Sequence, residues 1–513
     1  MAEPVWSIDP RTGKQREQVT VEATSADVDR AVRAAEATRE ALADRATRVT
    51  LLRTAADLLD EAGAELVATA DAETALGTPR LTGELARTTA QLRLFADEVA
   101  DGGYLDVVID HADDTTTPPR PDLRRYKVPL GVVAVYAASN FPLAFSVPGG
   151  DTASALAAGC PVVVKAHPDH PATSALCERL LRQAAARTGL PEDVVQVVHG
   201  FDAGLALIRH PLVAAAGFTG SVRGGRALFD AAAARPVPIP FHGELGSLNP
   251  VVVTAAAVAE RAEEIGSGLA GSMTLGVGQF CTKPGLVLVP EGEAGDRLVT
   301  ALTQAVSTVD SGVLLDGRMR DAFLAGVEAR TRLADVTAPV AAGPGGDGDG
   351  DRTVAAGFLT VPASRLTGKD PQYELLLEEC FGPVTVVARY RGEEEVAAVL
   401  EHLPGSLTAT VHLSSGECEG EGGQAAALLA TLSRIAGRVL VNGWPTGVAV
   451  THAQHHGGPY PATTSTFTSV GTTAIERWLR PVTYQSTPAA LLPPELREEN
   501  PLGLPRRVDG RRE

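Results

Sequence analysis

Short runs of β-branched residues alternate with alanine-rich stretches between residues 131 and 220, and this alternation constrains the fold more than any other feature. The runs GVVAVYA, PVVVKA, DVVQVVHG and AAAGFTG have the length of buried strands, and the segments between them have helical periodicity. Strands separated by helices form parallel sheets with right-handed crossovers. We therefore expect an open, doubly wound α/β sheet in this part of the chain.

The rest of the chain predicts a second α/β region and several connecting segments. Residues 249–450 contain the strand-like runs NPVVVT, GLVLVP, GFLTVPA, VTVVARY and RVLVNG. Residues 25–100 have apolar residues at three-to-four spacing, which predicts amphipathic surface helices. Residues 110–121 indicate a connection or an extended arm, and the Gly/Asp/Pro segment 338–352 indicates a surface loop. From about residue 491 the chain is rich in charge and proline, so we expect a tail that is poorly ordered or lies on a neighbour.

Length and charge exclude several classes of protein. A chain of 513 residues suggests about three structural units. Its net charge of −18 would repel a polyanion, so nucleic acid is not an expected partner. Five cysteines, odd in number and irregularly spaced, favour free thiols in a reducing cytoplasm. Residues 128–150 carry no charge, but prolines and a glycine pair interrupt them, so we interpret this stretch as a strand, a turn and a helix start rather than a membrane span.

Two short motifs suggest chemistry that the surrounding sequence does not favour. A G-x-G-x-x-G motif at 266–271 follows a helical segment rather than a strand, so we interpret its glycines as helix packing. His452, His455 and His456 have a spacing that metal sites use, but neither a carboxylate nor a cysteine accompanies them in the sequence. No metal site is therefore predicted.

Cys281 is the strongest candidate for a reactive group. It lies in the glycine-rich segment GVGQFCTKP, where a loop can expose the sulfur and let a substrate approach. A nucleophilic cysteine needs an acid–base partner and an oxyanion donor. Glu244 in FHGELGSLNP and Asn140 in AASNFP, both at the ends of expected strands, are the candidates. Taken alone, Glu244 is equally compatible with a helix-cap partner or a buried acid.

Six motifs in register resemble the aldehyde dehydrogenase family. They are SNFP at 139–142, VVVKAHP at 162–168, GFTGS at 217–221, HGELGSLNP at 242–250, GQFCTKP at 278–284 and EECFGP at 378–383. Within the family, the chain is most similar to bacterial members that prefer NADP and oxidise 2,5-dioxopentanoate (α-ketoglutaric semialdehyde) or fatty aldehydes.

The resemblance implies an α/β fold with a Rossmann-type cofactor domain, an α/β catalytic domain and a small oligomerisation arm. The corresponding ranges are 1–107 and 127–247 for the cofactor domain, 248–468 for the catalytic domain, 108–126 and 469–490 for the arm, and 491–513 for the tail. It also implies a homodimer or homotetramer in the cytoplasm, with no membrane partner.

The resemblance further implies a mechanism. Cys281 as thiolate attacks the aldehyde carbon, and the side-chain amide of Asn140 and the backbone N–H of Cys281 hold the resulting oxyanion. The nicotinamide takes the hydride, and Glu244 activates the water that hydrolyses the thioester. A coenzyme A-acylating dehydrogenase, a cysteine hydrolase and a catalytically silent binding protein are the alternatives, and the presence of Glu244 argues against the first.

The resemblance also assigns cofactor contacts. Lys165 and His167 would bind the adenosine ribose and any 2′-phosphate, Gly220 and Ser221 the pyrophosphate, and Glu379, with Phe381 behind it, the nicotinamide ribose. NAD-selective relatives often place an acid where this chain has Pro168. A phosphate meets no built-in repulsion there, so we expect NADP to be preferred, with NAD possible.

The substrate contacts are expected on the helix GELARTTAQLRLFADEV, which lines the aldehyde tunnel in relatives. Arg87 and Gln91 are four residues apart and so share one helix face. We expect Arg87 to bind a substrate carboxylate and Phe145 to be an apolar wall. The alternative is that Arg87 pairs with Glu84 on the surface.

Overall fold

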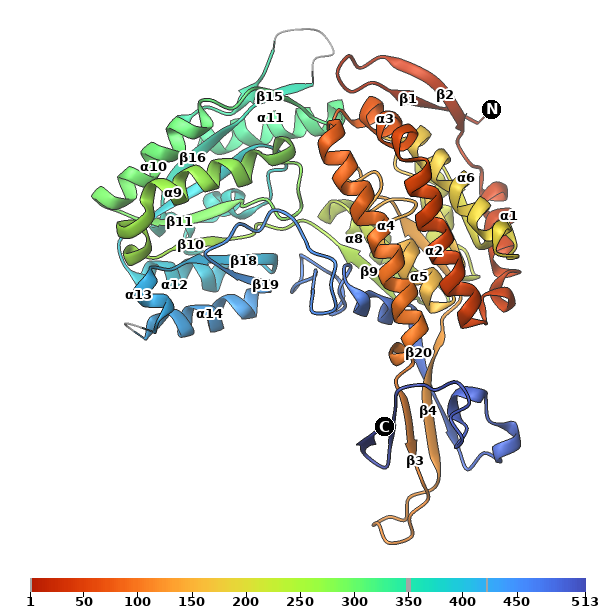
Figure 1. Ribbon diagram of the computed structural model, residues 1–513. Helices are drawn as coiled ribbons and strands as arrows, with labels where there is room; N and C mark the ends of the chain where they lie inside the picture. The colour runs from red at the N-terminus through yellow and green to blue at the C-terminus, as the bar shows by residue number, and fades with distance from the viewer. Residues whose placement is uncertain (1, 347–351, 421–422) are drawn as a thin grey trace.

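The protein consists of two α/β lobes that lie side by side, with a β arm that projects from one of them (Figure 1). The computed structural model describes residues 2–346, 352–420 and 423–513. The expected α/β architecture with two largely parallel sheets is confirmed.

The first lobe is built on a parallel five-stranded sheet with the order β7-β6-β5-β8-β9. The strands are β5 (Val132–Tyr136), β6 (Val162–Lys165), β7 (Val195–Val198), β8 (Val213–Thr219) and β9 (Phe241–Glu244), and the helices between them are α5 (Gly150–Ala158), α6 (Pro171–Arg187), α7 (Phe201–Arg209) and α8 (Val222–Ala233). The strand order reverses between β5 and β8, and doubly wound sheets bind ligands at the carboxyl ends of strands at such a point.

Helices from the N-terminal part of the chain cover this sheet. They are α1 (Ser25–Glu36), α2 (Arg45–Glu61), α3 (Gly63–Thr74) and α4 (Thr78–Asp101), and a hairpin of β1 (Pro4–Ile8) and β2 (Gln15–Val21) precedes them. The predicted helices are therefore confirmed. On α4, Leu81, Leu85 and Leu92 recur at helical spacing and are buried, so this face packs inward. Thr24 caps α1 through a capping box with Asp27.

The second lobe is built on a seven-stranded sheet with the order β13-β16-β17-β11-β10-β18-β19, parallel except for the edge strand β13. The strands are β10 (Val251–Val253), β11 (Leu286–Pro290), β13 (Thr337–Val340), β16 (Gly357–Pro362), β17 (Val384–Tyr390), β18 (Ser406–His412) and β19 (Ala436–Val441), with helices α9 (Ala255–Thr274), α10 (Glu293–Val306), α11 (Gly317–Thr331), α12 (Glu393–His402), α13 (Ser415–Cys418) and α14 (Gln424–Ile435). The strand β18 is not among the strands that the sequence predicts, because about half of SLTATVH is polar although the whole strand is buried.

The structure also bears on two smaller predictions, the surface loop at 338–352 and the glycines at 266–271. The segment 338–352 is not only a loop, since it contains the end of β13 and the short strand β14 (Gly343–Pro344), while residues 347–351 lie outside the described residues. Gly266 lies within α9, where a Cβ would stand 2.5 Å from the Leu298 carbonyl oxygen of α10. Helix packing is therefore confirmed for Gly266, whereas nothing among the described residues lies within 4 Å of a Cβ on Gly271. Within the described ranges, no helix combines the length and the apolar character needed to cross a membrane.

The arm is a five-stranded sheet with the order β20-β4-β3-β21-β22. Its strands are β3 (Val107–Asp110), β4 (Leu123–Pro129), β20 (Leu479–Gln485), β21 (Arg506–Val508) and β22 (Arg511–Arg512). The preceding turn η7 (Thr472–Trp478) packs on α5 of the first lobe, where the indole of Trp478 donates to Ser154 Oγ at 2.8 Å. The returning strand of the arm therefore begins at Leu479.

The expectation of a poorly ordered tail is wrong. Residues 506–508 pair in parallel with β3, and the C-terminal segment runs along the arm of its own chain (Figure 1). Leu496 and Leu504 are buried, and His111 lies between the carboxylates of Glu498 and Asp509 at 3.1 and 2.7 Å. A few well-placed leucines and ion pairs fix a segment whose average composition is typical of disorder.

Candidate active site

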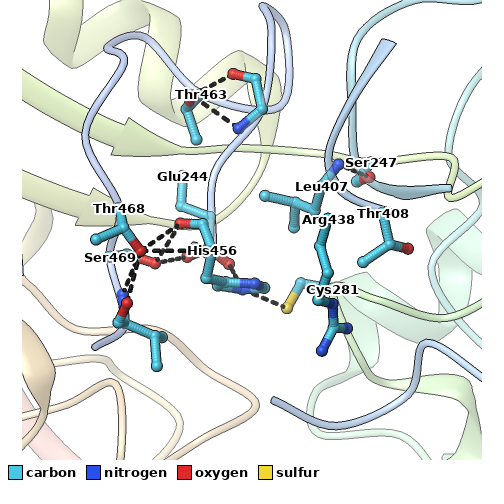
Figure 2. Close-up of polar contacts among 12 residues, drawn as sticks. Glu244, Ser247, Cys281, Leu407, Thr408, Arg438, His456, Thr463, Thr468 and Ser469 are labelled. Atoms are coloured by element: carbon cyan, nitrogen blue, oxygen red, sulfur yellow. Dashed lines mark hydrogen bonds and ion pairs between the residues drawn. The ribbon is translucent and has the colours of Figure 1, made fainter. Parts of the chain in front are cut away.

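Four side chains from distant parts of the chain meet between the two lobes (Figure 2). Glu244 is the last residue of β9, Cys281 follows the turn η4 (Leu275–Gly278), and His456 and Ser469 come from the irregular segment after β19. The carboxylate, thiol and imidazole donor atoms all lie within 4.8 Å of one another. The structure therefore brings Cys281 and Glu244 together, as the sequence predicts, and adds His456 and Ser469.

The backbone around Cys281 requires glycine. Gly276 and Gly278 have φ of 55° and 66°, in the left-handed region. A Cβ on Gly278 would collide with the carbonyl group of Gly382, which comes from the EECFGP motif. The side-chain amide of Asn249 donates to the carbonyl of Cys281 at 2.8 Å and holds the loop from the other side.

Glu244 is held as a carboxylate. His456 Nε2 donates to Oε1 at 3.0 Å, and Ser469 Oγ donates to Oε2 at 2.5 Å. Burial acts to raise the pKa of Glu244, but the electrostatic interaction with His456 and hydrogen bonds from His456, Ser469 and the Cys281 thiol outweigh burial and lower the pKa. Glu244 is therefore an ionised carboxylate at neutral pH, with lone pairs free to accept a proton during a reaction.

Cys281 is a protonated thiol in the free protein. Burial and the neighbouring Glu244 carboxylate raise its pKa well above the usual value, and Arg87 opposes them only in part. Its sulfur lies 3.6 Å from His456 Nε2, and the imidazole of His456 stands between it and Glu244 (Figure 2). Nucleophilic attack by Cys281 therefore needs a base at the moment of reaction, and Glu244 is adjacent.

Asn140 follows β5 and is buried beside the cysteine loop. Its side-chain Nδ2 donates to the carbonyl oxygen of Gln279 at 3.0 Å, and Arg80 Nη2 donates to the Asn140 carbonyl at 2.6 Å. The amide is thus fixed two residues from Cys281 in the loop it contacts. This position is compatible with the oxyanion donor that the sequence predicts.

A cavity of about 260 Å³ reaches Cys281. Its lining consists of three charged residues of α4, three phenylalanines and a few small residues: Arg80, Gly83, Glu84, Arg87, Phe141, Phe145, Phe280, Thr282, Gly447 and Val448. Such a pocket suits a small substrate with an apolar stem and an anionic end.

Arg87 lies in this cavity with its guanidinium largely without protein partners. Its Nε donates to the Val448 carbonyl at 3.4 Å and its Cζ lies 5.2 Å from the centre of the Phe145 ring. Both Nη atoms are buried and lack a hydrogen-bond partner within the described ranges. The alternative of surface pairing does not hold, because Glu84 is buried and its Oε1 instead accepts from the backbone N–H groups of Leu143 and Ala144.

Gln91 is not brought to the cavity. Its side-chain amide lies 2.6 Å from where a Cβ of Gly150 would stand, at the start of α5. A spacing of four residues moves a side chain one turn along the helix, and here that turn lies behind the cavity wall. Gln91 is not among the residues that line the cavity, and its contact with a substrate stays a prediction.

The adenosine-binding candidates lie at the end of β6. Lys165 is its last residue, and Nζ lies 4.8 Å from the centre of the exposed Phe201 ring. Burial lowers the pKa of Lys165 to about 8. His167 stacks on His170, and burial holds the pKa of His167 well below its ordinary value, so His167 provides no positive charge at neutral pH.

Several of the remaining cofactor candidates lie near the N-terminus of α8. Ser221 caps α8, with Oγ accepting from the Gly224 N–H at 3.2 Å, and Gly220 N–H donates to the Glu244 carbonyl. A Cβ on Gly246 would stand 2.8 Å from Glu379 Oε2, so only glycine leaves room there. Burial raises the pKa of Glu379 to about 7, opposed by Lys283. Phe381, partly buried, lies between η6 (Pro371–Leu377) and β17.

These groups fit a dinucleotide. A helix N-terminus binds a pyrophosphate through free N–H groups. Lys165 is buried, and its ammonium can bind a ribose hydroxyl or a phosphate. The Glu379 carboxylate, which lies close to Gly246, can accept hydrogen bonds from ribose hydroxyls.

His456 and Ser469 were missed by the analysis of the sequence. The sequence near His456 contains no carboxylate or cysteine and so predicts no site there, but the fold places both kinds of residue beside His456. Its partners Glu244 and Cys281 lie 212 and 175 positions earlier in the chain. The only local signal is the glycine pair that follows His456, and it is weak.

Comparisons with known proteins identify relatives of this chain. A family model described as "Aldehyde dehydrogenase family" matches residues 2–479. Alpha-ketoglutaric semialdehyde dehydrogenase 2 of Azospirillum brasilense is 48% identical over 96% of this chain and 93% of its own length. Alpha-ketoglutaric semialdehyde dehydrogenase of Acinetobacter baylyi is 42% identical over 89% and 86%.

Solved structures show the same fold at lower identity. Aldehyde dehydrogenase C of Pseudomonas syringae, a mutant in complex with NAD⁺ and octanal, is 22% identical, with a TM-score of 0.77 over 94% of both chains.

Proposed function

The chain belongs to the aldehyde dehydrogenase family and oxidises an aldehyde to a carboxylic acid, and from this premise we propose that its substrate is 2,5-dioxopentanoate, its product 2-oxoglutarate and its preferred cofactor NADP⁺. The observation that carries the proposal is Arg87, whose two Nη atoms are buried in the substrate cavity without a partner within the described ranges. A substrate carboxylate provides two acceptors for such a fork. The names of the two similar relatives support the same substrate.

The proposed first half-reaction begins at Cys281. Its thiol proton passes to Glu244, and the sulfur then bonds to the aldehyde carbon while the carbonyl electrons move to oxygen. The side-chain amide of Asn140 and the backbone N–H of Cys281 donate to this oxyanion. The bound nicotinamide supplies a hydride acceptor, so the carbon is left as a thioester on Cys281.

The proposed second half-reaction is hydrolysis. Glu244 first releases the thiol proton to solvent and then removes a proton from water, which attacks the thioester carbon and expels the sulfur. His456 and Ser469 keep one donor on each carboxylate oxygen, which fixes the orientation of Glu244. His456 is therefore a positioning residue in this proposal.

The proposed preference for NADP⁺ rests on the end of β6. Pro168 leaves no carboxylate three residues after Lys165, and a 2′-phosphate would meet the Lys165 ammonium. Asp169 is the nearby acid. Burial and, after it, the neighbouring Asp316 raise the pKa of Asp169 to about 7. A kcat/KM for NAD⁺ equal to or above that for NADP⁺ would overturn this part of the proposal.

The second candidate is a fatty or broad-specificity aldehyde dehydrogenase. Phe141, Phe145 and Phe280 make much of the cavity wall apolar, which favours neutral alkyl aldehydes. A wild-type preference for long alkyl aldehydes over 2,5-dioxopentanoate would select this candidate.

The deciding experiment is Arg87→Ala with matched substrates. Loss of a charge-assisted hydrogen bond of about 1.5–3 kcal/mol lowers kcat/KM for 2,5-dioxopentanoate by about ten- to a hundredfold. Pentanal, which has no carboxylate, should lose much less. An equal loss for both aldehydes would make Arg87 a structural residue.

We also infer that the protein is a cytoplasmic homodimer or homotetramer. The strand β20 is an edge of the arm sheet, and edge strands pair readily with another chain. The five cysteines are all free thiols, which suits a reducing compartment. Light scattering after size-exclusion chromatography measures the oligomeric state, and a monomer at micromolar concentration would contradict the inference.

A further inference from the structure

The cluster of Glu244, Cys281 and His456 has the donor set of a zinc site. It offers one carboxylate oxygen, one sulfur and one imidazole nitrogen, all within 4.8 Å of one another. Tetrahedral zinc, with Zn–S of about 2.3 Å and Zn–N of about 2.0 Å, separates these two ligand atoms by about 3.5 Å. The Sγ–Nε2 distance between Cys281 and His456 is 3.6 Å. The donors are therefore close to ligand spacing before any ion binds.

The ligands are also held from behind. Ser469 donates to Oε2 of Glu244 and leaves the other oxygen to face Cys281 and His456. The backbone N–H of His456 donates to Thr468 Oγ1 at 2.7 Å. Such supporting hydrogen bonds orient metal ligands and increase metal affinity.

The charges of the cluster match a divalent cation. The site offers one carboxylate, one sulfur that binds metals as a thiolate, and one imidazole. A zinc ion bound by one thiolate, one carboxylate and a neutral imidazole gives a site with no net charge.

An ion can reach these donors through the substrate cavity. Cys281 lines that cavity, whereas Glu244 and His456 are buried behind it. Three protein ligands leave a fourth position for water. An aldehyde and a zinc ion would therefore compete for the same sulfur.

We propose that Glu244, Cys281 and His456 bind one zinc ion, and that this ion reversibly inhibits the enzyme in competition with the aldehyde. A Zn–S bond forms as the thiol proton leaves to solvent, and no electron is transferred. A chelator reverses the step by taking the metal, and the sulfur regains its proton. The inhibition rests on the proposed role of Cys281, whereas the binding does not.

Cobalt(II) is the probe for binding, because a thiolate-to-cobalt charge-transfer band and intense tetrahedral d–d bands report the ligands directly. We expect the metal-free full-length enzyme to bind one cobalt per chain with both bands, and one equivalent of zinc to abolish them. Cys281→Ser should remove the charge-transfer band, and His456→Ala should weaken cobalt binding at least tenfold. Cys418→Ser, which removes an exposed thiol, is the control and should leave both bands unchanged.

Circular dichroism and NADP⁺ binding check that each variant is folded. The proposal is overturned if the bands are absent from the wild type, survive in Cys281→Ser or disappear in Cys418→Ser. Initial rates should show zinc inhibition that aldehyde competes away and EDTA reverses, and inhibition that is not competitive with aldehyde would overturn the inhibitory part. Cobalt bands in an enzyme that oxidises no tested aldehyde would contradict the proposed function alone.

Discussion

The catalytic cluster and the substrate cavity adjoin at Cys281 but differ in how their polar groups are satisfied. Both carboxylate oxygens of Glu244 have a donor, from His456 and Ser469. In the cavity, by contrast, both Nη atoms of Arg87 are buried and lack a partner within the described ranges. Buried polar groups are normally hydrogen-bonded. The comparison teaches that Glu244 has a donor on each oxygen without a ligand, whereas Arg87 keeps buried donors that suit the anion we propose.

The largest effect is expected from Cys281→Ser. A hydroxyl lacks the nucleophilicity of a thiolate, so dehydrogenase turnover should fall by about a thousandfold or more, while folding and cofactor binding persist. Steady-state reduction of NADP⁺ measures the loss, and Cys418→Ser is the matched control. Near-normal turnover in Cys281→Ser would mean that the cluster is not the reactive centre.

Glu244→Gln separates the two half-reactions. The amide cannot take a proton from water, so thioester hydrolysis should slow by about a hundred- to ten-thousandfold. If Glu244 serves mainly this second step, rapid mixing should still give a burst of reduced cofactor near one equivalent per site. Intact cofactor binding with no burst would mean that the proton transfer from Cys281 to Glu244 in the first half-reaction, rather than thioester hydrolysis, limits this variant.

His456 tests whether the cluster depends on its hydrogen bonds. His456→Ala removes the donor to Glu244 Oε1, and loss of a bond to a charged group should lower kcat by about ten- to a hundredfold. His456→Gln keeps an N–H donor of similar reach and should recover part of that loss. Equal rates for the two variants would assign His456 to packing alone.

The same contrast explains what the sequence could predict. Cys281 and Glu244 lie in short motifs with glycines and apolar neighbours, and their setting is local, so they could be identified. His456 could not, because its role depends on partners brought from far along the chain by two different sheets. Arg87 could be assigned to a helix face from its spacing, but Gln91 could not be excluded, since helical periodicity does not say where a cavity ends.

The fold was predictable to a similar extent. Buried parallel strands such as β5 and β11 consist of apolar runs, which predict them directly. The strand β18 alternates apolar residues with threonines and ends in His412, so its burial depends on the neighbouring strands β10 and β19. The C-terminal tail is likewise fixed by its pairing with β3, which its composition does not reveal.

The smallest effect concerns Lys165, which resembles Arg87 as a buried cation that a ligand would complete. Its pKa of about 8 is set mainly by burial, with Asp169 and Glu22 opposing. Below pH 8 the free enzyme keeps the ammonium that would meet a 2′-phosphate, and above pH 8 it loses this charge. The Kd for NADP⁺ should therefore rise by up to about twofold from pH 7 to 8 and by up to about tenfold by pH 9. NADPH fluorescence titration measures the corresponding Kd without turnover.

Lys165→Arg stays charged and should remove the pH dependence, and the Kd for NADH should vary less with pH than the Kd for NADPH. An equal rise in Kd with pH for NADPH and NADH would place the 2′-phosphate away from Lys165. Arg87 would then be the one of these two buried cations that a ligand anion completes.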